Sequence, residues 1–389
     1  MQKHKGNRKF YYLDNAAATP IDSQVLSAMN KAAGLYGNPS SFNNAGRAAR
    51  AEIEKSRQAI AAFLGARPDE IVFMGSGSEA NNLAILGSLS GLESGTVLTT
   101  LIEHRSILEP LRRLALKIKY ISVDQTGLID LKEFERLLGT DCRMVSVMYA
   151  NNEIGTIEPI KKISRTIKAF NKKYNTKILF HVDACQATLF LEMNVQNLGV
   201  DFLSFDGCKI YGPHGVGGLY IRKGTVVQPL IVGAGQEHGL KAGTENIQNI
   251  VGLAEAISLI QPAQGIKISA LRDYAIGKLR VIPEVMVNGP AGDGRLPNNI
   301  NLAVAGLTSE VLLLELDKHG IYAGSGSACT SHGVEPSRVL KAIGVPASHI
   351  NGALRFSLGR ATTKKDIDYL VKTLVKIIPQ LAKRYARLR

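Results

Sequence analysis

Five short groups of small and polar residues carry the side chains in this sequence that are best suited to chemistry. Each group follows a run of β-forming residues, so each is expected where a strand ends. The ends of parallel strands are where α/β proteins bind their ligands. The groups are residues 75–82, 103–104, 151–155, 181–186 and 204–215.

The first group has the composition of a phosphate-binding turn. It reads Gly-Ser-Gly-Ser-Glu-Ala-Asn-Asn and precedes a predicted helix. A residue as small as Gly77 lets the backbone approach a ligand closely, and the free N–H groups and dipole of a helix N-terminus attract an anion. Ser78 adds a hydroxyl group. A glycine turn with a serine cap looks the same, so this group alone does not assign a function.

Two later groups place an acid and a base at strand ends. Asp183 ends an apolar strand, where a partly desolvated carboxylate needs a cation or a hydrogen-bond donor. The protonated nitrogen of a pyridine ring would serve. Lys209 follows the next predicted strand, and a lysine in a dry pocket readily condenses with an aldehyde. Taken singly, such a lysine is most often a surface residue, and His104 is most often structural.

Together the groups predict one ligand. They supply a phosphate cradle, a histidine to stack on a ring (His104), a carboxylate for a pyridine nitrogen (Asp183) and a lysine for an aldehyde (Lys209). Pyridoxal 5'-phosphate requires this set of partners. We therefore predict a site for that cofactor.

The elements that must position these groups alternate between short strands and helices, which is typical of an α/β fold with a mostly parallel sheet. Several strand runs are apolar throughout, as expected for strands covered on both faces. Strands are predicted at residues 70–74, 96–100, 119–123, 144–149, 177–182, 201–205 and 218–221, and helices at 47–64, 79–89, 108–116 and 131–138.

The alternation changes near residue 260. A long helical region at residues 250–279 leads to shorter strands at 285–288, 299–302 and 353–357. We predict a large cofactor-binding domain over residues 21–258. A smaller α+β domain is predicted from residues 1–20 together with 259–389.

Length and composition describe an ordinary globular protein. The 389 residues are 45% hydrophobic and 21% charged, and no apolar run approaches the roughly 18 residues of a membrane span. The four cysteines form no CxxC pair and are too few for a disulfide framework. The basic first ten residues are not followed by the apolar segment of a secretory signal. We expect a cytoplasmic protein with no membrane partner and no metal site.

The formal net charge of +14 is concentrated in two amphipathic segments. Residues 161–177 hold seven Lys and Arg and no acid, and residues 361–389 hold eight against two acids. These faces are either solvated surface or a docking surface for an acidic protein or RNA. No aromatic-rich RNA-binding signature accompanies the charge, so we do not expect a nucleic-acid partner.

Taken in order, the motifs resemble those of the cysteine desulfurases of the NifS/IscS type, which are class V aminotransferases with the type I fold of pyridoxal-phosphate enzymes. The resemblance covers nearly the whole chain. Its most specific motif is the loop Gly-Ser-Gly-Ser-Ala-Cys that ends in Cys329. The other matching motifs are residues 12–20, 37–41, the five groups above, 242–246 and 355–360.

The resemblance implies how the cofactor is held. Lys209 would bind it covalently and later move the substrate α-proton, while Asp183 would pair with the pyridine nitrogen. His104 would stack on the ring and assist proton transfer, and Gln186 would bond the ring hydroxyl. The phosphate would be held by Gly77, Ser78 and, from the second subunit of a homodimer, Thr244.

The resemblance also implies the reaction. Asn152 and Arg355 would bind the carboxylate of L-cysteine, Arg355 by a bidentate fork. Cys329 would attack the substrate sulfur, which leaves L-alanine and a persulfide on Cys329. That sulfur would pass to an acceptor such as an iron–sulfur scaffold, or toward thio-cofactor or tRNA synthesis. Gly324 and Gly326 make a hinge-rich loop that suits such a transfer.

The sequence departs from the family around the phosphate. Asp206 and Cys208 stand where the family usually has a serine and a histidine, within the predicted cofactor site. An aspartate beside a phosphate is repulsive, so Asp206 must turn away, be protonated or be offset by a cation. Cys208 is a rival nucleophile, because the neighbouring Lys209 is a cation and cations lower the pKa of a thiol. Cationic residues of the family are replaced or shifted at His214, His238 and Lys241.

Three functions from different classes follow. The preferred one is an active cysteine desulfurase. The second is a diverged family member with weak or absent cofactor that acts as a partner-binding protein. The third is a basic nucleic-acid-binding protein, which the charge alone supports.

Overall fold

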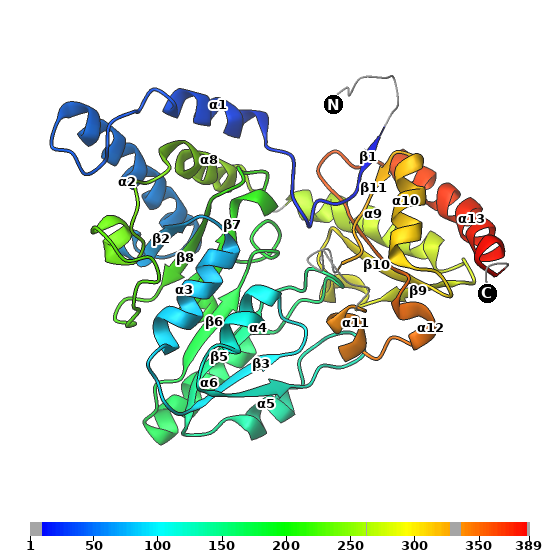
Figure 1. Cartoon of the computed structure of the whole chain (residues 1–389), viewed down its shortest axis with the longest axis horizontal. Coiled ribbons are helices and arrows are strands. Elements are labelled where there is room, and N and C mark those ends of the chain that lie inside the picture. The colour runs from blue at the N-terminus through cyan, green and yellow to red at the C-terminus, as the bar shows by residue number, and fades with distance from the viewer. Residues whose placement is uncertain (1–9, 262, 327–335, 387–389) are drawn as a thin grey trace.

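The computed structural model describes residues 10–261, 263–326 and 336–386 (Figure 1). A seven-stranded sheet forms the centre of its larger part. The strands run in the order β2-β8-β7-β6-β5-β3-β4. Their bounds are β2 (Ile71–Met74), β3 (Thr96–Thr100), β4 (Lys117–Ile121), β5 (Cys142–Met148), β6 (Leu179–Asp183), β7 (Phe202–Asp206) and β8 (Gly217–Ile221).

The direction of these strands decides where the polar groups gather. Neighbours β4, β3, β5, β6 and β7 pair in parallel, and β8 is antiparallel to both β7 and β2. The carboxyl ends of β2, β3, β5, β6 and β7 therefore meet at one edge of the sheet. All five predicted groups follow one of these strands, so the topology brings them to the same edge.

Helices cover the sheet on both faces (Figure 1). The central strands are buried on both faces, and every residue of β2 and β8 is buried, whereas the edge strand β4 is only partly buried. The long helices α1 and α2 pack against α8. The helices of this part are α1 (Ser23–Ala32), α2 (Asn44–Leu64), α3 (Gly77–Leu89), α4 (Arg105–Leu111), α5 (Leu131–Leu137), α6 (Ile160–Tyr174), α7 (Val195–Leu198) and α8 (Ile247–Ser258), with short 3-10 turns η1 (Pro68–Glu70), η2 (Gly207–Lys209) and η3 (Gln236–Gly239).

A second hydrophobic cluster lies in the C-terminal part of the chain. It joins Leu13 to residues between 268 and 381, such as Leu302, Phe356 and Leu370. Its antiparallel sheet has the order β12-β10-β9, and a two-stranded parallel sheet pairs β1 with β11. The elements are β1 (Tyr11–Tyr12), α9 (Ala263–Leu279), β9 (Val285–Asn288), η4 (Gly292–Gly294), β10 (Asn299–Val304), α10 (Ser309–Lys318), β11 (Ile321–Tyr322), α11 (Arg338–Ala342), α12 (Ala347–Ile350), β12 (Ala353–Ser357) and α13 (Lys364–Ala386).

This cluster supports the predicted division into residues 21–258 and residues 1–20 plus 259–389, which we keep as a proposal. A smaller cluster crosses the division, because it joins Ile102 and Met148 to Leu340. The N-terminal segment belongs with the second cluster because β1 pairs with β11. No helix in the described part of the chain is long and apolar enough to span a bilayer.

Two sequence-based helix predictions were wrong in their bounds. The predicted helix at 108–116 is α4 (Arg105–Leu111), which begins where the His104 side chain accepts the Ser106 amide and ends just beyond Pro110. The predicted helical region at 250–279 is divided between α8 and α9. Helix α8 ends at Ser258, and the amide of the next residue, Leu259, bonds the Glu255 carbonyl.

Candidate active site

Asp183 is the buried acid at the centre of the site. It ends β6 and is 7% exposed. Its Oδ2 accepts a hydrogen bond from Asn81 Nδ2 at 2.8 Å, and its Oδ1 accepts one from the Cys185 amide at 3.0 Å. Two donors therefore fix the orientation of the carboxylate.

A chain of hydrogen bonds links Asp183 to His104. Asn81 Nδ2 also donates to Ser106 Oγ at 2.9 Å, and Ser106 Oγ lies 2.7 Å from His104 Nδ1. The Ser106 amide donates to the same ring nitrogen at 3.2 Å. Because Nδ1 accepts that amide proton, the network assigns the ring proton of a neutral His104 to Nε2.

Lys209 lies in η2, directly after β7. Its Nζ donates to the carbonyl of Ala17. The neighbouring Ala16 carbonyl accepts a hydrogen bond from Gln186 Nε2 at 2.9 Å, and Thr19 Oγ1 donates to the Cys208 carbonyl at 3.0 Å. The N-terminal segment therefore crosses the sheet edge and contacts the turn that carries Lys209.

Asp206 points to the N-terminus of α3. Its Oδ2 accepts a hydrogen bond from the Gly77 amide at 2.8 Å, and its Oδ1 accepts one from the Cys208 amide at 2.9 Å. The sequence predicts that Asp206 turns away from the phosphate turn, is protonated or is offset by a cation. The first alternative is excluded, because the carboxylate bonds that turn. Ser78 lies in the first turn of α3 and is exposed.

Two of the described thiols, those of Cys185 and Cys208, lie near this edge and have raised pKa values. Burial, and next the charge of Asp206, raises the pKa of the Cys208 thiol to about 12. Lys209 lowers the pKa of Cys208, as predicted, but burial and the charge of Asp206 outweigh it, so the net shift is upward. Burial also raises the pKa of the Cys185 thiol well above its usual value, followed by the charge of Asp183.

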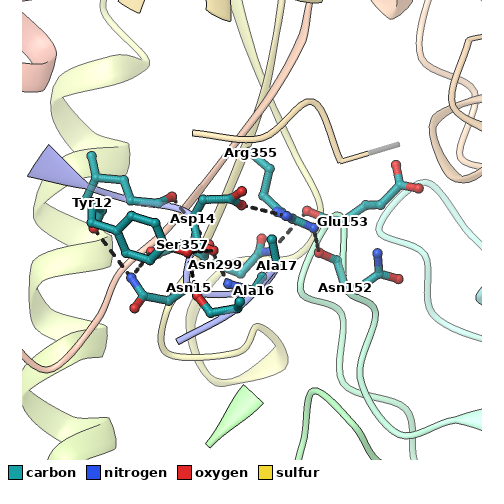
Figure 2. A network of polar contacts seen from close by, with 12 residues as sticks. Tyr12, Asp14, Asn15, Ala16, Ala17, Asn152, Glu153, Asn299, Arg355 and Ser357 are labelled. Atoms are coloured by element: carbon teal, nitrogen blue, oxygen red, sulfur yellow. Dashed lines mark hydrogen bonds and ion pairs between the residues drawn. The ribbon is translucent and has the colours of Figure 1, made fainter. Parts of the chain in front are cut away.

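Arg355 approaches the same edge from β12 (Figure 2). Its two terminal nitrogens bond the Asp14 carboxylate, at 2.7 Å, and the Asn152 carbonyl, at 3.0 Å. The guanidinium is almost fully buried, and its Nε has no partner among the described residues. It joins the segment before α1, the loop after β5 and the small sheet, and it retains donor capacity for a carboxylate ligand.

The predicted nucleophile Cys329 lies outside the described residues. The residues that flank it are held by one buried acid, Glu153. The Ser337 hydroxyl donates to Glu153 Oε2 at 2.5 Å, and Gly326 packs against the same carboxyl group. Burial raises the pKa of Glu153, with Arg355 and His104 as opposing charges.

The architecture and these side chains match known proteins. A family model for class-V aminotransferases matches residues 11–370. The chain belongs to this family.

Among its relatives, a cysteine desulfurase IscS of Dictyoglomus turgidum is 43% identical over 380 residues, 95% of each chain. One of Clostridium botulinum is 41% identical over 383 residues, 96% of this chain and 95% of the relative. A solved NifS-like protein superposes with a TM-score of 0.88 at 34% identity, over 95% of this chain and 100% of that chain. The predicted resemblance and the mostly parallel α/β fold are confirmed, and the chain is an enzyme of the cysteine desulfurase type.

The cofactor typical of this family fits the site at its ring end. An acid, a histidine and a lysine lie at one sheet edge, and the charges of Asp183, Asp206 and Lys209 all act on the Cys185 thiol between them. The phosphate end differs, because a carboxylate already occupies an amide of the α3 N-terminus. The ring-binding residues fit pyridoxal phosphate; the phosphate-binding residues carry an additional negative charge.

Thr244 stands apart from the other predicted residues. It is exposed, and no described contact joins it to them. The segment before it is fixed on β2: Glu237 forms a buried ion pair with Arg57 at 2.8 Å and accepts the Phe73 amide at 2.7 Å. Glu237 and His238 adopt left-handed backbone angles there.

Sequence reasoning missed four residues of the site. Asn81 and Ser106 link Asp183 to His104, and Asp14 and Ala17 bond Arg355 and Lys209. Asn81 had a local signal, because it is a polar residue on the buried side of a largely apolar helix. Asp14 and Ala17 lie in the motif at residues 12–20, but their partners Arg355 and Lys209 are distant in sequence. Ser106 lies two residues beyond His104, outside the group at residues 103–104.

Proposed function

We propose that this enzyme converts L-cysteine to L-alanine and places the sulfur on Cys329 as a persulfide. The carbon–sulfur bond of the substrate breaks and a sulfur–sulfur bond to the Cys329 thiol forms. The substrate carbon is reduced and the transferred sulfur is oxidised, so no external oxidant or reductant is needed. Pyridoxal phosphate, when bound, supplies the electron sink for this chemistry.

Each residue has a proposed part in that reaction. Lys209 holds the cofactor and moves the substrate α-proton, and Asp183 keeps the ring nitrogen protonated. His104 faces the ring and assists proton transfer, and Gln186 bonds the ring hydroxyl. Arg355 and Asn152 bind the substrate carboxylate.

The observation that carries the proposal is the hydrogen-bonded chain from Asp183 through Asn81 and Ser106 to His104, at the sheet edge that also holds Lys209. A carboxylate with two fixed donors and a histidine with a fixed tautomer are preorganised groups. The named relatives and a solved SspA structure in complex with cysteine, at 31% identity and a TM-score of 0.77, support the substrate. They do not favour a partner-binding protein without activity.

A homodimer and a sulfur-acceptor protein complete the proposal. Apolar side chains are strongly exposed on two segments of the large part, Tyr36 and Phe42 between α1 and α2 and Val226 and Val232 after β8. Such patches suit a protein interface. We propose that a second subunit covers them and brings its Thr244 to the phosphate, in a cytoplasmic enzyme that delivers sulfur to an iron–sulfur scaffold or a related acceptor.

Substitution of the two reactive residues tests the function. Lys209→Ala should abolish the visible absorbance of lysine-bound cofactor and alanine formation, whereas Lys223→Ala, an exposed lysine just after β8, should leave both unchanged. Cys329→Ser should still bind cofactor and cysteine but form neither alanine nor persulfide. Mass spectrometry should place the added sulfur on the Cys329 peptide. A persulfide on Cys208, or wild-type alanine formation by Cys329→Ser, would contradict the mechanism.

A further inference from the structure

The N-terminus of α3 is already occupied by carboxylates of this chain. Asp206 Oδ2 accepts a hydrogen bond from the Gly77 amide. Glu79 folds back so that its Oε2 accepts one from the Gly75 amide. The Ser76 hydroxyl caps the same turn by accepting the Glu79 amide. These amides belong to the turn that would otherwise offer its N–H groups to an anion.

Asp206 is held there from two sides. One oxygen bonds the first residue of α3, and the other bonds the Cys208 amide, in the turn that carries Lys209. The carboxylate thus connects β7 and η2 to the start of α3. A helix dipole stabilises an anion at this position, and it does so whether the anion is a side chain or a phosphate.

The surrounding charges do not remove the conflict with a phosphate. Glu79 adds a second acid, paired with Lys241 Nζ at 3.7 Å. Lys209 is the cation nearest to Asp206 along the chain. Once it is covalently attached to the cofactor, its nitrogen would be neutral or would share its positive charge with the cofactor ring, so it would offset Asp206 less. Two carboxylates and a phosphate group would then face one helix N-terminus.

We propose that Asp206 is a built-in anion that competes with the cofactor's phosphate for the N-terminus of α3. It stabilises the cofactor-free enzyme and weakens phosphate binding, so the enzyme gains little affinity from the phosphate group. This inference rests on the proposed pyridoxal-phosphate function, and it assigns to Asp206 a specificity-determining position within that site.

The test compares two cofactor forms that differ only in the phosphate. Cofactor-free wild type, Asp206→Ser and Asp206→Asn are titrated with pyridoxal phosphate and with pyridoxal, and the absorbance of lysine-bound cofactor gives each Kd. Both variants should bind pyridoxal phosphate at least about tenfold more tightly and pyridoxal within about twofold of wild type. Glu135→Gln, an exposed acid on α5, is the control for net charge and should change neither Kd.

The thermal stability of the cofactor-free variants provides a second measurement, which should change in the direction opposite to the cofactor affinity. Loss of the Asp206 carboxylate removes a helix-capping anion, so the Tm of both cofactor-free variants should fall while their affinity for pyridoxal phosphate rises. An unchanged or weaker affinity of both variants for pyridoxal phosphate overturns the inference, provided that wild type forms lysine-bound cofactor. If no variant and no wild-type protein forms it with either ligand, the proposed function fails as well.

Discussion

At the scale of single residues, Asn81 connects two parts of the site. One amide group donates both to Asp183 and to Ser106, so it orients the acid and, through Ser106, the histidine. Loss of these bonds is costly, because a buried polar group left without a partner carries a desolvation penalty. Asn81 is a positioning residue, since it acts through Asp183 and His104.

We predict unequal effects for the two linking residues. Asn81→Ala should lower kcat for alanine formation by about tenfold or more, because it removes a charge-assisted bond to Asp183 of about 1.5–3 kcal/mol. Ser106→Ala should cost only a few-fold, since the Ser106 backbone amide still bonds His104 Nδ1. Steady-state kinetics over pH 6–9 would measure both. A larger loss of kcat in Ser106→Ala than in Asn81→Ala would contradict the proposed roles of these two residues in the hydrogen-bonded chain from Asp183 to His104.

At the scale of elements, the close approach of α3 to the ends of β6 and β7 depends on a glycine. A Cβ built on Gly77 would lie 2.3 Å from Cys185 Sγ and 3.3 Å from the Cβ of Asp206. No other residue type fits between these groups without a shift. The α3 N-terminus can therefore meet Asp206 only because position 77 has no side chain.

A pair of substitutions tests this packing. Gly77→Ala should lower the free energy of unfolding by about 1–3 kcal/mol, the usual cost of overpacking a close contact. Cys185→Ala in the same chain removes the clashing sulfur and should recover most of that loss. A double-mutant cycle from urea denaturation of the cofactor-free protein measures the coupling. Additive effects, with no recovery, would show that the helix moves away as a whole.

At the scale of the whole molecule, two buried ionisable groups limit the pH range of stability. Burial lowers the pKa of His181 to about 4, against the opposing charge of Asp183. Burial raises the pKa of Glu158 to about 8, while a hydrogen bond from the Ile129 amide opposes the shift. Both groups are held in their neutral forms inside the large part of the molecule. Protonation of His181 in the unfolded chain lowers stability as the pH falls from about 6.5 to 4.

Glu158 acts at the alkaline side. Its folded pKa is above its unfolded pKa, so the stability it contributes is complete below about pH 4.5 and is lost as the pH rises to about 8. Glu158→Gln mimics the neutral acid. Between pH 5.5 and pH 8, its stability relative to wild type should rise by about 2–3 kcal/mol, since each pKa unit equals about 1.4 kcal/mol. Urea denaturation of the cofactor-free protein measures this. If the free energies of unfolding of Glu158→Gln and wild type change in parallel with pH, the prediction is contradicted. The control variant Glu135→Gln should follow the wild-type pH profile.

The sequence by itself determined the order of the elements and the place of Asp183, His104 and Lys209 at one sheet edge. Local patterns suffice for this, because an apolar run marks a buried strand and parallel strands end at the same edge. Only the tertiary structure decided where Asp206 points, that Cys208 has a raised pKa, and that Asp14 pairs with Arg355 across 341 positions of the chain. Side-chain direction, burial and long-range partners follow from how the elements pack, and no local pattern encodes them.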